Sequence, residues 1–113
     1  MWQPFESGAS IGTPGSEGGR IVTDEEYAGA ARITLEGGTR IGAPFAITCG
    51  VYGWFVHTCY LPGEPEAQCA LAAMKSALER IVALCDDATG GKPEASDRAA
   101  LDAIARFVDR FPT

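Results

Sequence analysis

An uncharged stretch from Ala43 to Leu61 constrains the fold more than any other part of the chain. It contains the only histidine, two of the four cysteines and half of the aromatic residues. Aromatic and β-branched residues favour strands, and the glycines of this stretch, Gly50 and Gly53, lie near its middle. The pattern therefore predicts two strands folded onto each other as a β-hairpin.

The register of this hairpin depends on the length of its turn. Tyr52-Gly53 is the best candidate, because glycine in a two-residue loop accepts the left-handed backbone that tight hairpins require. Thr48 would then lie opposite His57. One face would carry Phe55, His57, Cys59 and Leu61. A loop one residue longer would instead shift the register and place Cys49 on the face of His57 and Cys59. The sequence leaves both registers open.

Two further strands are expected before the hairpin. Residues 30–36 alternate apolar and polar side chains, so Ile33 and Leu35 should point toward a core while their neighbours face water. Residues 20–23 predict a short strand. The acidic run Asp24-Glu25-Glu26 that follows is typical of a solvated turn.

The first 19 residues are rich in Gly and Ser, which is the composition of a loop. Trp2, Phe5 and Ile11 are spread through this segment and are expected to anchor it to the rest of the molecule. The predicted organisation is therefore an N-terminal segment, residues 1–19, followed by a single domain, residues 20–113.

Apolar residues recur at helical spacing in the second half of the chain. The stripe Leu71, Met74, Leu78, Ile81 and Cys85 predicts a helix near residues 65–86. The stripe Leu101, Ile104, Ala105, Val108 and Phe111 predicts another near residues 94–110. The expected fold is α+β: an antiparallel meander of about four strands, packed on one face by a C-terminal helical hairpin that covers Ile33 and Leu35.

Charge and composition narrow the classes of partner. The formal net charge of −6 argues against nucleic acid, because binding to a phosphate backbone needs a basic face. No stretch has the pattern of a membrane-spanning helix, and the N-terminal residues lack the features of a signal peptide. We therefore expect a cytoplasmic protein whose cysteines are thiols.

The candidates for chemistry are His57 and Cys59, which are two residues apart on one predicted strand. They suggest a small enzyme or a thiol-dependent ligand-binding module, in which Thr48 orients the imidazole ring. The spacing of the cysteines matches no structural zinc motif, so neither a metal nor another cofactor is expected. Only the longer hairpin loop would bring Cys49 to His57 and Cys59 as a third ligand.

The absence of a complete catalytic set in the sequence favours a different function. Aromatic residues on both faces of the hairpin exceed what a sheet with one wet face needs, and Tyr52, Phe55 and Leu61 are the predicted interface. The sequence thus favours a non-catalytic protein-interaction domain, such as an adaptor, an inhibitor or an immunity-type protein. Its expected partner is a basic protein or a second copy in a homodimer.

Overall fold

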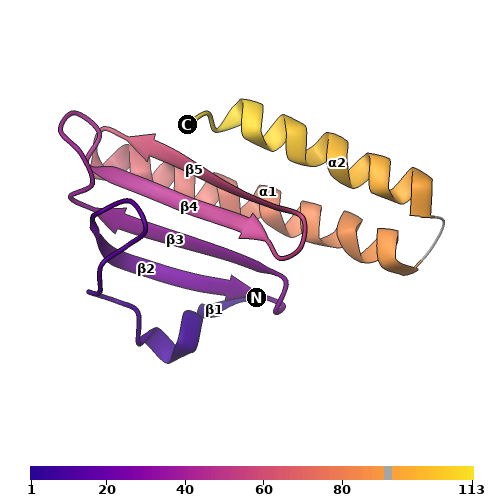
Figure 1. The fold of residues 1–113 in the computed structure, drawn as a ribbon, viewed down its shortest axis with the longest axis horizontal. Coiled ribbons are helices and arrows are strands. Elements are labelled where there is room, and N and C mark those ends of the chain that lie inside the picture. Colours follow the sequence, from indigo (N-terminus) through magenta and orange to yellow (C-terminus); the bar gives the residue numbers. More distant parts are fainter. Residues whose placement is uncertain (91–92) are drawn as a thin grey trace.

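The computed structural model contains an antiparallel sheet of five strands in the order of the sequence, followed by two helices (Figure 1). The strands are β1 (Trp2–Pro4), β2 (Arg20–Tyr27), β3 (Ala31–Gly37), β4 (Phe45–Val51) and β5 (Phe55–Leu61). The helices are α1 (Glu64–Gly90) and α2 (Pro93–Arg110). The structure describes residues 1–90 and 93–113, and the side chains outside residues 87–96. The predicted α+β class is confirmed.

The sheet has five strands rather than about four because the N-terminal segment contributes one. Trp2 of β1 pairs with Tyr27, the last residue of β2, and the centroids of the two rings lie 5.2 Å apart. The indole Nε1 of Trp2 donates a hydrogen bond to Glu79 of α1 at 3.0 Å. Trp2, which the sequence predicts as an anchor of the N-terminal loop, thus holds the short edge strand β1 against both the sheet and helix α1.

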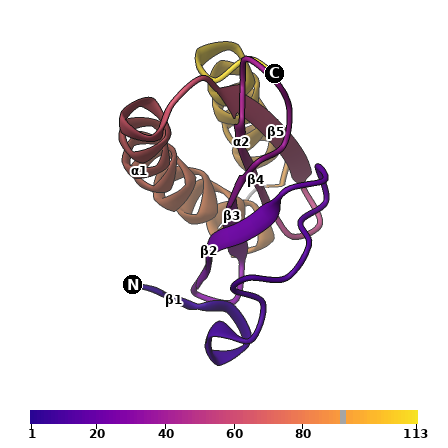
Figure 2. The same ribbon diagram turned by 90° about the vertical axis from the view of Figure 1, so that its left-hand side faces the viewer.

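Both helices lie on the same side of the sheet (Figure 2). The core between the layers includes Ile33, Leu35 and Ile47 from the sheet and Met74 and Leu78 from α1, each at most 1% exposed. The alternation in β3 and the stripe of α1 therefore meet as the sequence predicts.

Helix α2 packs mainly against α1 and runs beside the edge strand β5 (Figure 1). Its Phe107 ring meets Phe55 edge-on, with centroids 5.6 Å apart. His57 forms a hydrogen bond of 2.5 Å between its Nε2 and the carbonyl oxygen of Phe111. These contacts attach the end of α2 to β5.

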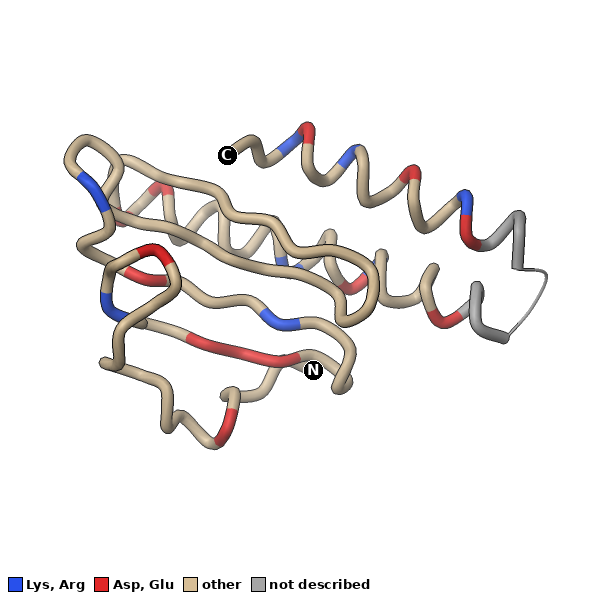
Figure 3. The backbone as a smooth tube through the Cα atoms, in the orientation of Figure 1, with Lys and Arg blue, Asp and Glu red and all other residues tan. Residues whose placement is uncertain are grey.

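The acidic run is part of strand β2, so its prediction as a solvated turn was wrong (Figure 3). Successive strand residues point to opposite faces, and each carboxylate finds a partner on its own side. Glu25 forms an ion pair with Lys75 of α1. Asp24, only 2% exposed, forms one with Arg32 on the other face.

The hairpin has the longer of the two loops. Val51 pairs with Phe55, so three residues form the turn, and Gly53 has the left-handed φ of 81°. Cys49 therefore lies opposite His57, and Thr48 lies opposite Thr58. The predicted two-residue turn, with Thr48 opposite His57, was wrong because the same glycine serves either loop length.

The described helices include none that is both long and apolar enough to cross a lipid bilayer.

Candidate functional site

The sheet face opposite the helices carries a row of short polar side chains across four strands. Asp24, Thr34, Thr48 and Thr58 are successive partners in the ladder from β2 to β5. The hydroxyl oxygens of Thr48 and Thr58 lie 3.2 Å apart. The neighbouring row contains Glu26, Arg32, Gly50 and Val56. We call this surface the open face.

A groove of about 660 Å³ lies on the open face. It is lined by residues 14–16, Ile21, Arg32, Thr34 and residues 48–56. The N-terminal loop thus forms one wall and the β4–β5 hairpin contributes the other. The volume lies within the range of ligand-binding pockets, which are mostly apolar with a few placed polar groups.

The N-terminal loop is held over the sheet by the carboxylate of Glu36, which is fully buried. The backbone N–H of Gly19 donates to Oε1 of Glu36 at 2.9 Å, and that of Glu17 donates to the same carboxylate at 3.2 and 3.3 Å. Hydrogen bonds to a charged acceptor are among the stronger ones in proteins. A glycine-rich segment therefore forms a fixed wall of the groove.

The floor of the groove is low because position 50 is a glycine. A Cβ atom at Gly50 would lie 2.2 Å from the carbonyl oxygen of Phe55, which is closer than non-bonded atoms approach. The adjacent strand therefore excludes any side chain at this position, and its absence helps keep the groove open. Val56, the ladder partner of Gly50, is 80% exposed.

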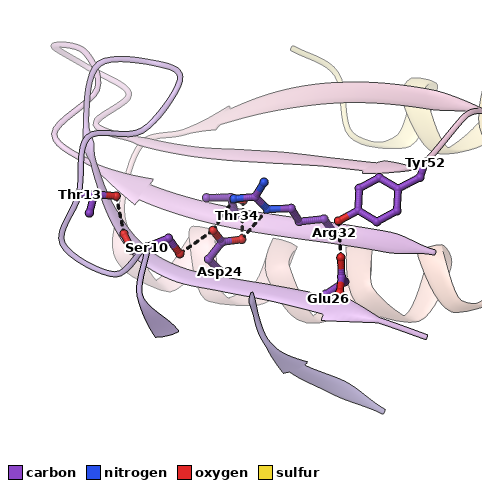
Figure 4. A network of polar contacts seen from close by, with 7 residues as sticks. All are labelled: Ser10, Thr13, Asp24, Glu26, Arg32, Thr34 and Tyr52. Carbon is purple, nitrogen blue, oxygen red and sulfur yellow. Dashed lines mark hydrogen bonds and ion pairs between the residues drawn. The ribbon is translucent and has the colours of Figure 1, made fainter. Parts of the chain in front are cut away.

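A polar network borders the groove on the side of β2 (Figure 4). Arg32 donates from Nε to Oδ1 of Asp24 at 2.9 Å and from Nη2 to Oδ2 at 2.6 Å. The hydroxyls of Thr34 and Ser10 donate to the same carboxylate at 2.9 and 2.7 Å. The guanidinium carbon also lies 3.6 Å from the centroid of the Phe5 ring. The N-terminal segment thus contacts both members of the ion pair.

These contacts fix the charge states of the pair. Burial alone would raise the pKa of Asp24, but hydrogen bonds from Arg32, Ser10 and Thr34 outweigh it and lower the pKa below its ordinary value. The hydrogen bond to Asp24 raises the pKa of Arg32 further. The groove is therefore bordered by a neutralised ion pair that does not titrate near neutral pH.

Tyr52 closes the other end of the network (Figure 4). Its hydroxyl donates to Oε2 of Glu26 at 2.5 Å. Desolvation, followed by this hydrogen bond, raises the pKa of Tyr52 to about 12. The phenol therefore remains protonated and holds the carboxylate of Glu26 at the rim.

The three predicted catalytic residues do not form a common site. The imidazole of His57 is bonded to the Phe111 carbonyl, and Thr48 is on the opposite face of the sheet. Cys59 lies opposite Ile47 and faces the core. Desolvation raises the pKa of the Cys59 thiol, and it raises that of Cys49 to about 12. Thiols in such surroundings are protonated and poorly nucleophilic.

The three predicted interface residues also separate. Tyr52 is 49% exposed at the groove, whereas Phe55 and Leu61 pack against the core. The register places Phe55 and Leu61 toward the helices, so they do not share an uncovered face, and their role in an interface stays a prediction. Val56 is the exposed apolar residue of β5. The three-residue turn, which the sequence leaves open, predicts Val56 on the face opposite Phe55 and Leu61.

The register brings Cys49 opposite His57. This is the arrangement in which Cys49 could join His57 and Cys59 as a third metal ligand. Among the described residues, no three or more His, Cys, Asp or Glu side chains form a group that could hold a metal ion. The expected independence of zinc stays a prediction.

Comparisons of the chain with protein-family models, with curated proteins and with solved structures find no match.

Proposed function

We propose that this chain is a non-catalytic protein-interaction domain that binds its partner in the groove of the open face. The observation that carries the proposal is the combination of an open groove of about 660 Å³ with two exposed residues that line it, Val56 at 80% and Tyr52 at 49% exposed. Concave, mostly apolar surfaces with a few placed polar groups are typical of binding sites.

The polar groups around the groove support binding rather than catalysis. Asp24 is occupied by Arg32, Thr34 and Ser10, and Glu26 accepts the hydroxyl of Tyr52. A general acid or base needs a pKa near the working pH, and the shifts of Asp24 and Tyr52 move both groups away from it. These groups give the groove a fixed shape and polarity.

The partner we propose is a basic protein or a second copy of the chain. The formal net charge of −6 would attract a basic protein over long range and speed its association. A cytoplasmic adaptor, inhibitor or immunity-type protein fits this description. The four cysteines, all free thiols, suit the reducing cytoplasm.

The alternative is a small enzyme or thiol-dependent module that uses His57 and Cys59. It requires a thiol with a lowered pKa, whereas burial raises the pKa of Cys59. No observation in the described part of the chain favours this alternative, and thiol labelling distinguishes it from the main proposal.

Site-specific photocrosslinking tests the proposed function. Benzoylphenylalanine is placed at Val56 beside the groove and, as the matched control, at Gln68, an exposed residue of α1. Each variant is expressed in the cells that naturally contain the protein. We expect one discrete adduct from position 56 and none from position 68. A mass of twice the chain identifies a homodimer, and any other discrete mass identifies a second protein. Equal adducts from both positions, or none, would refute binding in the groove.

A further inference from the structure

The helical layer contains a second cleft, far in sequence from the groove and different in charge. It has a volume of about 370 Å³ and lies between α1 and α2. From α1 it is lined by Ala77, Arg80, Ile81 and Leu84, from α2 by Ala103, Arg106, Phe107 and Arg110, and by Phe111 directly after α2. Apart from Phe111, these positions follow the spacing of three and four that marks one face of a helix. We call it the arginine cleft.

Three of the nine basic residues of this acidic chain line the arginine cleft. Arg80, Arg106 and Arg110 are all exposed, and the described residues contain no ion pair that involves them. The guanidinium of Arg110 lies 4.9 Å from the centroid of the Phe111 ring. Asp102 and Asp109 are exposed on the same helix, and neither forms an ion pair with these arginines in the described structure.

Other basic side chains are used within the fold. The partners are a carboxylate for Arg32 and Lys75, a backbone carbonyl for Arg20 and an aromatic ring for Arg40. Arg80 and Arg106 have no such partner in the described structure, and Arg110 contacts only the ring of Phe111, so the cleft presents three guanidinium groups that no carboxylate neutralises through an ion pair.

We propose that the arginine cleft binds an acidic amphipathic helix of a partner protein. The half-buried side chains of Leu84 and Ala103 line the cleft above the buried Ile81 and Phe107, and a third helix can lie in the groove between two antiparallel helices. Arg80 lies on one margin and Arg106 and Arg110 lie on the other. Positive charge on both margins complements acidic residues on both flanks of an apolar stripe.

The distribution of charge favours a helix over an anionic lipid. A fatty acid has one carboxylate at its end, whereas the cleft presents three guanidinium groups distributed along both helices. This surface is separate from the open face, so the proposal stands independently of the one made for the groove.

The test uses the whole chain and a synthetic helical peptide with leucines at positions i, i+3, i+4 and i+7 and glutamates on both flanks. Binding is measured by calorimetry and mapped by amide chemical shifts. We expect the shifts to cluster in residues 77–84 and 103–111. We also expect the affinity to fall at least about tenfold when salt is raised from about 50 to 300 mM, because exposed charges are screened.

Two charge reversals provide matched variants. Arg106→Glu changes the cleft, and Arg98→Glu makes the same change at an exposed position of α2 outside it. We expect R106E to weaken binding about tenfold or more and R98E to change it less than about twofold. Thermal unfolding of both variants checks that each remains folded.

Three results would overturn the proposal. One is equal binding of the peptide to R106E and R98E. The second is equal binding of control peptides in which the glutamates are glutamines or the leucines are serines. The third is binding of dodecanoate in the cleft without binding of the peptide, which would make the occupant an anionic amphiphile.

Discussion

Asp24 shows how a single side chain connects the N-terminal segment to the sheet. Its carboxylate accepts hydrogen bonds from Ser10 before β2, from Arg32 and Thr34 on β3, and the Arg32 guanidinium also stacks on Phe5. The sequence alone places this residue in an acidic run whose composition favours a turn. Its partner lies on another strand, so only the pairing of β2 with β3 reveals the ion pair.

Asp24→Asn should destabilise the protein by about 2–3 kcal/mol at pH 7, because it leaves a partly buried guanidinium without its counter-charge. The native pKa of Asp24 lies below its ordinary value. Its contribution is therefore present above an unfolded-state pKa of about 3.9 and is lost as the pH falls through the native pKa. Urea unfolding at pH 7 and at about pH 2 measures both effects.

The wild type and D24N should approach each other in stability at the lower pH. Asp102→Asn, at an exposed position of α2, is the control and should cost less than about 0.5 kcal/mol. A difference between wild type and D24N that is the same at both values of pH would contradict the proposed ion pair.

The four thiols should differ in reactivity. Iodoacetamide should modify Cys69, which is exposed, and leave Cys49, Cys59 and Cys85 unmodified in the native protein from about pH 5 to 9. The last three are buried, and burial raises the pKa of each. Mass spectrometry of native and denatured samples counts the adducts. Labelling of Cys59 faster than a free model thiol would support the enzyme alternative.

At the scale of elements, the β4–β5 hairpin determines what faces the groove. Gly50→Ala should destabilise the protein by about 2–3 kcal/mol, because its Cβ would meet the backbone oxygen of Phe55. The control is Gly53→Ala in the same hairpin, where nothing lies within 4 Å of an added Cβ and only the φ of 81° is unfavourable.

We expect G53A to cost about 1 kcal/mol, which is less than G50A. Thermal unfolding ranks the two variants, and amide exchange along β5 reports whether the strands separate. Equal losses of stability in the two variants would mean that the close approach of β5 to Gly50 does not limit which residue position 50 accepts.

Elements with a strong local pattern could be predicted from the sequence. Both helices and strand β3 lie close to their expected ranges, because their apolar residues repeat with the period of one buried face. The hairpin register could not be predicted, since Gly53 suits a turn of two or three residues. That difference of one residue moves every side chain of β5 to the other face. The predicted faces of the interface candidates Phe55 and Leu61, and of the catalytic candidates His57 and Cys59, therefore depended on the length of the turn.

The groove itself depends on contacts between distant residues. Glu36 lies in an alternating strand and would be expected in water, yet the backbone of Glu17 and Gly19 surrounds its carboxylate. No local pattern in the sequence indicates which residues a glycine-rich segment will cover. Residues 1–19 were therefore predicted as an anchored loop, while their role as a wall of the groove was missed.

At the scale of the whole molecule, the core is large enough that folding should not require zinc. The buried apolar residues of β3, β4, α1 and α2 form one continuous cluster, whereas small zinc-dependent domains have sparse cores. Treatment with a chelator should leave the thermal midpoint unchanged to within about one degree. A fall of about ten degrees, or stoichiometric zinc in the purified protein, would show this prediction to be wrong and would point to Cys49, His57 and Cys59 as the ligands.

The order of the strands also has a kinetic consequence. Every strand pairs with its neighbour in sequence, so the sheet can assemble through a series of short loop closures. Pairing between neighbours in sequence lowers the contact order relative to a sheet with crossover connections, which favours faster folding. The most distant described hydrogen bond between side chains joins Trp2 to Glu79, across 77 positions. Its closure requires a much larger loop than any hairpin does. Docking of β1 onto the helical layer is thus the step expected to come last, and the fluorescence of Trp2 is placed to report it.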